Sequence, residues 1–258
     1  GENVQTGDTV SDGNQTDQTM GTVQSPATGE EAAMPETTGT ETQDPAATVP
    51  VEEILQEVVY HTVDDSYFDD AVFIGDSRTV GMYEYGGLEE TSTFYASTGL
   101  TVYKMFDSAI VSVPGQKKKI TVEEALSEKQ FAKIYLMIGI NDIAHHLSTD
   151  SIIKNITKII RKIKKETPST QLYIQSLLPT NDSFERFKTI MGKTPQIIEI
   201  NQQLEELAPI EKYTYIDLFP HLTTPGTTVL DPQYTNDGLH LLGDGYLVWK
   251  DVLLPYLQ

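Results

Sequence analysis

Ala71-Val72-Phe73-Ile74-Gly75-Asp76-Ser77-Arg78-Thr79 is a short apolar run that leads straight into a polar turn. Residues 71–74 are typical of a strand that a parallel sheet buries on both faces. Gly75 permits a sharp turn, and a helix can then open at Ser77 and run through Tyr83. A serine at such a turn is exposed, rigidly held and close to the positive end of a helix dipole. It could equally be an ordinary helix N-cap, so this stretch alone leaves the role of Ser77 open.

Apolar runs and helical periodicities alternate along the rest of the chain. Further strands are expected at residues 93–96, 133–138, 172–177 and 213–216. Helices are expected at residues 121–126, 152–163, 196–207 and 245–257, the first of them opened by a capping box at Thr121 and Glu124. The alternation predicts an α/β fold with a central, mainly parallel five-stranded sheet covered by helices on both faces.

The net charge of −20 is concentrated near the N-terminus. Residues 1–77 hold 17 of the 38 acidic residues and neither Lys nor Arg, which leaves 21 acidic residues against all 18 basic residues in 78–258. The part of the chain expected to fold is therefore nearly neutral. It carries no basic footprint, which argues against nucleic acid as a partner.

Residues 1–50 differ in composition from the rest of the chain. They include eleven Thr and no Leu, Ile, Phe, Tyr or Trp. Such a stretch cannot bury enough apolar surface to fold, so we expect a disordered acidic linker. Residues 51–69 are expected to be a helical lead-in to a domain at 70–258. We hypothesise that the linker tethers an exported bacterial domain, either extracellular or held at the cell surface.

Two absences narrow the chemistry. The chain has no cysteine, which excludes disulfides, thiolate metal sites and cysteine nucleophiles. No apolar run approaches the roughly 20 residues that span a bilayer, so no membrane insertion of the domain is expected. The oligomeric state is left open.

Four predicted strand ends or nearby loops carry polar residues that could meet at one edge of the sheet. They are Ser77, Gly99, Gly139-Ile140-Asn141-Asp142 and Asp237-Gly238-Leu239-His240. A serine nucleophile needs a base near neutral pKa, usually His, and the base needs an acid that fixes its tautomer. His240 and Asp237 could supply these, with Asp217 as a rival acid. Taken alone, Asp237 and Gly238 could instead be a plain turn, with His240 merely flanking a helix.

Asn141 follows an apolar strand and a glycine. Its amide could donate to a developing oxyanion together with the backbone N–H groups of Ser77 and Gly99. The alternative is a simple turn-forming Asn. Asp76 and Asp142 are expected to stabilise the two turns through backbone hydrogen bonds.

Together these blocks resemble the SGNH hydrolases, also called the GDSL esterases and lipases. Gly75-Asp76-Ser77 matches the nucleophile block, with Arg78 in place of the usual Leu. Gly99 corresponds to the block with a backbone donor, residues 139–142 to the Gly-x-Asn-Asp block, and residues 237–240 to the Asp-x-x-His block. The resemblance covers roughly residues 70–258. An α/β-hydrolase elbow fits less well, because Thr79 stands where its second glycine belongs.

The resemblance implies a flavodoxin-like three-layer α/β/α sandwich and a serine esterase. Ser77, His240 and Asp237 would form its triad, and Ser77, Gly99 and Asn141 its oxyanion hole. Neither metal nor organic cofactor would be needed, and Arg78 in place of Leu could alter the pocket rim without changing a catalytic role. The adjacent His145 and His146 could suggest a metal site with Asp142, but a solvated loop is favoured because no third ligand is apparent.

The expected substrate is a small acyl ester, such as an O-acetyl group on a cell-wall or environmental glycan. The polar stretch at residues 180–193 shows no sign of the apolar mouth that a lipid would need. Two alternatives stay open: an O-acyltransferase that uses the same triad, and a surface binding module without activity.

Overall fold

The computed structural model describes residues 65–182 and 193–254. The expected linker at residues 1–50 and most of the expected lead-in helix lie outside these residues. The described end of the lead-in is a short 3-10 helix, η1 (Asp65–Phe68).

A five-stranded parallel sheet forms the centre of the described chain. In spatial order its strands are β2 (Thr93–Ala96), β1 (Ala71–Gly75), β5 (Lys133–Met137), β6 (Gln171–Gln175) and β7 (Thr214–Ile216). Counting only these five strands along the chain, the order is 2-1-3-4-5, which is the flavodoxin-like order. The predicted fold class is therefore confirmed, and the five expected strands lie within one or two residues of their predicted bounds.

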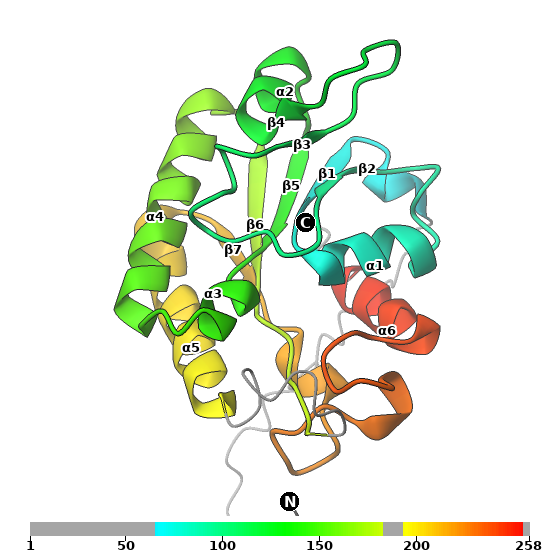
Figure 1. Cartoon of the computed structure of the whole chain (residues 1–258), viewed down its shortest axis with the longest axis vertical. Helices are drawn as coiled ribbons and strands as arrows, with labels where there is room; N and C mark the ends of the chain where they lie inside the picture. Colours follow the sequence, from blue (N-terminus) through cyan, green and yellow to red (C-terminus); the bar gives the residue numbers. More distant parts are fainter. Residues whose placement is uncertain (1–64, 183–192, 255–258) are drawn as a thin grey trace, which may run out of the picture. The chain divides into compact units, whose positions relative to one another are not determined.

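Helices cover both faces of the sheet (Figure 1). They are α1 (Ser77–Tyr85), α2 (Val122–Glu128), α3 (Ile140–Ala144), α4 (Thr149–Glu166), α5 (Thr194–Glu211) and α6 (Gly243–Leu253). Figure 1 shows α1 and α6 together on one side of the sheet and α4 and α5 on the other. No helix among the described residues is both long and apolar enough to cross a membrane.

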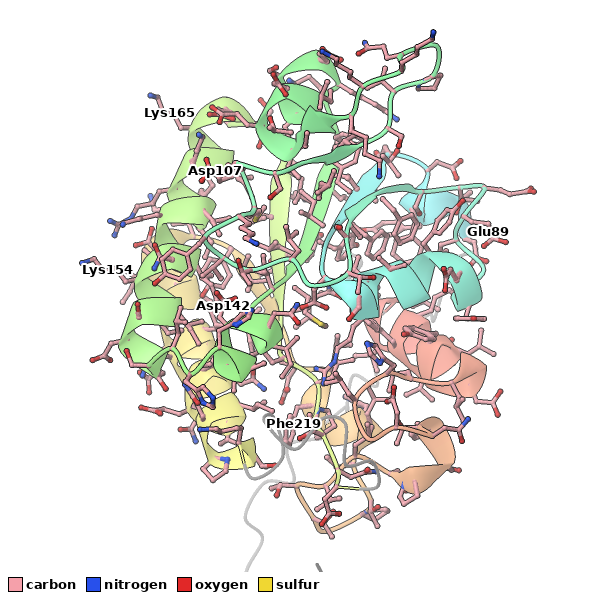
Figure 2. The ribbon with its side chains drawn as sticks, in the orientation of Figure 1. Glu89, Asp107, Asp142, Lys154, Lys165 and Phe219 are labelled. Atoms are coloured by element: carbon pink, nitrogen blue, oxygen red, sulfur yellow. The ribbon has the colours of Figure 1, made fainter. Side chains whose placement is uncertain are left out.

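The periodicity that predicted α4 reappears as its buried face. Six isoleucines of α4 pack into the core: Ile152, Ile153, Ile156, Ile159, Ile160 and Ile163. Lys154 and Lys165 lie on the opposite face of α4 and point outward (Figure 2). The predicted capping box of α2 is also present, because Thr121 and Glu124 each accept a hydrogen bond from the other's backbone N–H.

Five short elements were not anticipated from the sequence. They are the two-stranded antiparallel sheet of β3 (Ala109–Val111) and β4 (Ile120–Thr121), the short helix α3, and the 3-10 helices η3 (Phe219–Leu222) and η4 (Pro232–Tyr234). These elements are too short for hydrophobic periodicity to indicate them. Among the predicted helices, α6 begins two residues before its predicted start, and its predicted end at 255–257 lies outside the described residues.

A row of aromatic rings crosses one face of the sheet. Phe94, Phe73, Tyr135 and Tyr173 come from four neighbouring strands and are direct partners in the strand register. Their ring centroids lie 5.0, 4.8 and 4.6 Å apart in succession, with the rings nearly parallel. Cross-strand pairs of this kind stabilise one register over its alternatives. The row therefore helps to align the carboxyl ends of β2, β1 and β5, from which the candidate site is built.

Candidate active site

Ser77 is the first residue of α1, directly after β1. The N-cap is its neighbour Asp76, whose Oδ1 accepts the Arg78 N–H at 3.0 Å. The alternative that Ser77 itself caps the helix is therefore wrong. Gly75 is required at this turn, since an added Cβ would lie 2.4 Å from the carbonyl oxygen of Met137 on β5 and 2.2 Å from the hydroxyl of Thr79. The turn is thus built to leave the Ser77 side chain available to partners outside the helix.

The partner of the Ser77 hydroxyl is His240. Ser77 Oγ lies 3.0 Å from His240 Nε2, and His240 Nδ1 lies 2.8 Å from Asp237 Oδ2. A carboxylate can only accept a hydrogen bond, so Nδ1 carries the proton and Nε2 is left to accept from the Ser77 hydroxyl. The side chains of His240 and Asp237 are about one third exposed, at 35% and 29%. The structure brings together the three residues predicted for the triad, in a geometry able to remove the serine proton.

The loop that carries Asp237 and His240 is held by a small hydrogen-bond network. Asp237 Oδ1 accepts the N–H groups of Leu239 and His240 at 2.9 and 2.7 Å. Thr235 Oγ1 accepts the Gly238 N–H and donates to the His240 carbonyl at 2.8 Å. Burial of the Asp237 carboxylate acts to raise its pKa, but the hydrogen bonds from His240 and Leu239 outweigh this and hold the pKa below its ordinary value. Asp237 is therefore held as the anion that an imidazole partner requires.

The three predicted oxyanion donors come from neighbouring strands. Ser77 follows β1, and its N–H lies in the first turn of α1, where backbone N–H groups have no partner inside the helix. Gly99 follows β2 in a turn closed by the Leu100 N–H and the Ser97 carbonyl at 3.1 Å, and its φ of +75° favours glycine. The Ser97 N–H binds the Gly75 carbonyl at 3.1 Å, which ties this turn to β1.

Asn141 lies on α3, just after β5. Its side-chain NH₂ group donates to the Leu100 carbonyl at 2.9 Å and so holds the turn that contains Gly99. An amide NH₂ has two hydrogens. The second hydrogen is the candidate oxyanion donor.

Asp142, the residue after Asn141 on α3 (Figure 2), binds the loop after β2. Its Oδ2 accepts the Val102 N–H at 3.0 Å, and the residue is buried. Burial raises the pKa of Asp142 from 3.8 to about 6, and the nearby Asp76 carboxylate adds to the rise, while hydrogen bonds and His145 oppose it. Asp142 thus connects the loops after β2 and β5.

Arg78, which was expected to alter the pocket rim, has no side-chain surface at a rim. The side chain is completely buried. Its Nη1 and Nη2 donate to the carbonyl oxygens of Leu178 and Pro179 at 3.1 and 3.4 Å. Burial lowers the pKa of Arg78 to about 10, while the carboxylates of Asp76 and Asp237 act to raise it, so the group is still a cation at neutral pH.

Other sequence candidates do not join the site. Asp217, the rival acid, accepts the Phe219 N–H at 3.2 Å, whereas Asp237 is the carboxylate bound to His240 Nδ1. No group of three or more His, Cys, Asp or Glu that could hold a metal occurs within the described ranges. Cavities of about 1120 and 520 Å³ lie elsewhere: the larger at the start of β6 and β7 beside α6, the smaller between α4 and α5.

Two structural roles, those of Arg78 and Thr235, were not found from the sequence. Arg78 binds the distant carbonyls of Leu178 and Pro179, whereas Thr235 holds its own loop through Gly238 and His240. Asp142 was expected to stabilise a turn through backbone hydrogen bonds, and it accepts one from the distant Val102. The sequence offers one usable signal, which is the charged residue at position 78 directly after a strand and turn expected to be buried. The contacts of Thr235 and Asp142 depend on loop conformations that have no sequence periodicity.

Comparison with known proteins places this geometry in a family. A sequence model of the GDSL-like lipase/acylhydrolase family matches residues 73–248, well over half of the chain. The chain therefore belongs to that family, and with its fold this is consistent with the SGNH hydrolase superfamily.

Solved structures share the fold. A Streptococcus pneumonia protein provisionally named a platelet activating factor is 26% identical, with a TM-score of 0.58 over 74% of this chain and 85% of its own. A GDSL-like lipase from Bacteroides thetaiotaomicron is 21% identical, with a TM-score of 0.57 over 73% and 87%. Est24, a carbohydrate acetylesterase from Sinorhizobium meliloti, is 13% identical, with a TM-score of 0.52 over 72% and 97%.

A curated relative matches only in part. The N-acylneuraminate cytidylyltransferase of Escherichia coli is 23% identical over 126 residues, which are 48% of this chain and 28% of that protein. The match thus covers little more than a quarter of that relative.

The raised pKa of Asp142 predicts a specific pH dependence of stability. Between about pH 4 and pH 6 the folded protein keeps a proton on Asp142 that the unfolded chain releases, so ionisation in this window destabilises the fold. In Asp142→Asn this loss is absent. The free energy of unfolding of the wild type minus that of the variant should therefore fall as the pH rises from 4 to 6 and stay level above that. Urea denaturation across this range measures the difference, and a difference independent of pH would contradict the assignment.

Proposed function

We propose that this protein is a serine esterase in which Ser77, His240 and Asp237 act as a catalytic triad. The observation that carries the proposal is the unbroken series of hydrogen bonds from the Ser77 hydroxyl through the imidazole to the Asp237 carboxylate. Membership of the GDSL-like lipase/acylhydrolase family supports an ester as the substrate.

The reaction would proceed in two halves. His240 Nε2 takes the Ser77 proton while Oγ attacks the ester carbonyl carbon, and the resulting oxyanion accepts hydrogen bonds from the N–H groups of Ser77 and Gly99 and the Asn141 amide. His240 then gives the proton to the departing alkoxide, which leaves an acyl group on Ser77. Water attacks the acyl carbon by the same route, with His240 as base, and Ser77 regains its proton.

For the substrate, we propose a short acyl ester, with O-acetyl groups on glycans favoured. Two solved structures with the same fold are named a carbohydrate acetylesterase and an acetyl-xylooligosaccharide esterase. Neither of the two cavities described above is lined by Ser77 or His240, so a long acyl chain bound at Ser77 would gain nothing from them.

We also propose that the domain acts outside the cell or at its surface, with residues 1–50 as a spacer. Their Thr-rich, acidic composition supports this. An antibody against the domain should detect it on intact cells of the source organism or in their medium. Detection confined to the lysed-cell fraction would contradict this localisation.

Removal of the proposed nucleophile should abolish hydrolysis. Ser77→Ala is expected to lower kcat on p-nitrophenyl acetate by about 10⁴-fold or more, because the remaining groups cannot form the acyl intermediate. Ser127→Ala, at an exposed position on α2, is the matched control and should keep wild-type activity. A fluorophosphonate should label the wild type once per chain, at Ser77. An unlabelled wild type would favour a binding module instead.

Acyl-chain length should separate a short-chain esterase from a lipase. Against p-nitrophenyl esters from acetyl to octanoyl, kcat/KM should be highest for acetyl, because neither of the two cavities described above lies at Ser77 to bury added methylenes. Acetylated xylooligosaccharides should release free acetate, and Ser77→Ala provides the blank. Rising kcat/KM with chain length would refute the short-chain assignment. Transfer of acetyl to an added sugar, without free acetate, would identify a transferase.

A further inference from the structure

Residues 176–181, called here the connecting segment, run buried and without regular secondary structure after β6. Buried irregular chain is unusual, because each of its backbone polar groups needs a partner. Side chains and neighbouring loops supply these partners. Asn201 on α5 binds both the N–H and the carbonyl of Leu177, at 2.8 and 2.9 Å. The next two carbonyls, of Leu178 and Pro179, are those that Arg78 binds.

The far end of the connecting segment contacts the loop that carries the proposed acid and base. The Asn181 N–H donates to the Gly238 carbonyl at 2.9 Å. Contact there is so close that an added Cβ on Gly238, whose φ is +76°, would lie 2.3 Å from the Asn181 carbonyl oxygen. Gly238 directly follows Asp237 and lies two residues before His240. Displacement of Asn181 would therefore shift the side chains of both Asp237 and His240.

We propose that Arg78 is a positioning residue for the reaction: its buried guanidinium fixes the connecting segment, which in turn holds Asp237 and His240 at hydrogen-bond distance from Ser77. Arg78 follows the proposed nucleophile in the chain, so the same short turn sets the position of Ser77 and, through these contacts, that of its base. This inference rests on the proposed function. The side chain of Arg78 is completely buried and therefore offers no surface to a substrate.

The central experiment compares Arg78→Met with a matched variant at the opposite end of the strands, where β5 begins. Lys133, at the start of β5, is also a mostly buried cation that donates to a carbonyl, that of Tyr67 at 3.0 Å. Arg78→Met should lower kcat by about 100-fold with KM unchanged, because an error of about 1 Å in the position of the base is enough for such a loss. Lys133→Met should change thermal stability but leave kcat within twofold. Folded Arg78→Met with wild-type kcat would overturn the proposal.

Arg78→Lys tests whether two separate donor nitrogens are needed for the two carbonyls. It also tests the proposal if Arg78→Met does not fold. A lysine keeps the charge but presents one nitrogen where Arg78 uses two. At least a tenfold loss of kcat is expected. Wild-type kcat in Arg78→Lys would mean that the charge alone matters, and it would overturn the proposed role of the two carbonyl contacts.

A double variant tests the route through the connecting segment. Gly238→Ala should push residue 238 away from Asn181 and lower kcat by itself. If Arg78 acts through this contact, Arg78→Met combined with Gly238→Ala should lose little more than the worse single variant. Losses that multiply fully would show that Arg78 acts by another route and would overturn the proposal.

Failure of the proposed function can be told apart from failure of this inference. Fluorophosphonate labelling of the wild type at Ser77 tests the function without reference to Arg78. The hydrogen bond from His240 to Asp237 can be followed independently of activity, as a downfield ¹H NMR signal that is absent in His240→Ala. That signal should move or vanish in Arg78→Met and stay in Lys133→Met; an unchanged signal in Arg78→Met contradicts the positioning role.

Discussion

The register of three neighbouring parallel strands is the constraint on which the site depends. Gly75 at the end of β1 lies opposite Ala96 of β2 and Met137 of β5, so the three strands end level with one another. Each then contributes one group to the same place, namely Ser77, Gly99 and Asn141. A shift of one residue would turn each strand's side chains to the opposite face of the sheet. The stacked rings of Phe94, Phe73 and Tyr135 oppose such a shift, and they lie away from the site they align.

The position of the site also follows from the strand order. In an open parallel sheet the crevice for a ligand forms where neighbouring strands send their connections to opposite faces. Here β1 is followed by α1 on one face, and the chain after β5 passes through α3 to α4 on the other (Figure 1). Ser77 and Asn141 are the residues at that divergence. The proposed donors and the proposed nucleophile therefore need no long loops to meet.

The chain itself was sufficient to predict the strands and the residues that gather at the carboxyl edge. Those predictions depend on short apolar runs, helical periodicity and blocks of specific residue types, all of which are local. The flavodoxin-like order, by contrast, was implied by the resemblance of those blocks to the SGNH hydrolases. The exact position of the helix cap was not predictable in this way, since Asp76 and Ser77 are both good capping residues. The contacts of Arg78, and the distant partner of Asp142, were not predictable for a different reason. Each joins residues 40 or more positions apart through a backbone group, and any residue type can supply that partner.

The residue at position 78 is best understood together with the segment it binds. Burial of a cation costs several kcal/mol that an apolar side chain of similar size does not incur, so stability alone does not account for an arginine there. Two successive buried carbonyls in an irregular segment nevertheless need donors, and a planar guanidinium can reach both at once. A leucine at this position would supply no donor to these two carbonyls. The arginine after the serine therefore suits the conformation of residues 176–181 and, through Asn181, the position of the loop that carries Asp237 and His240.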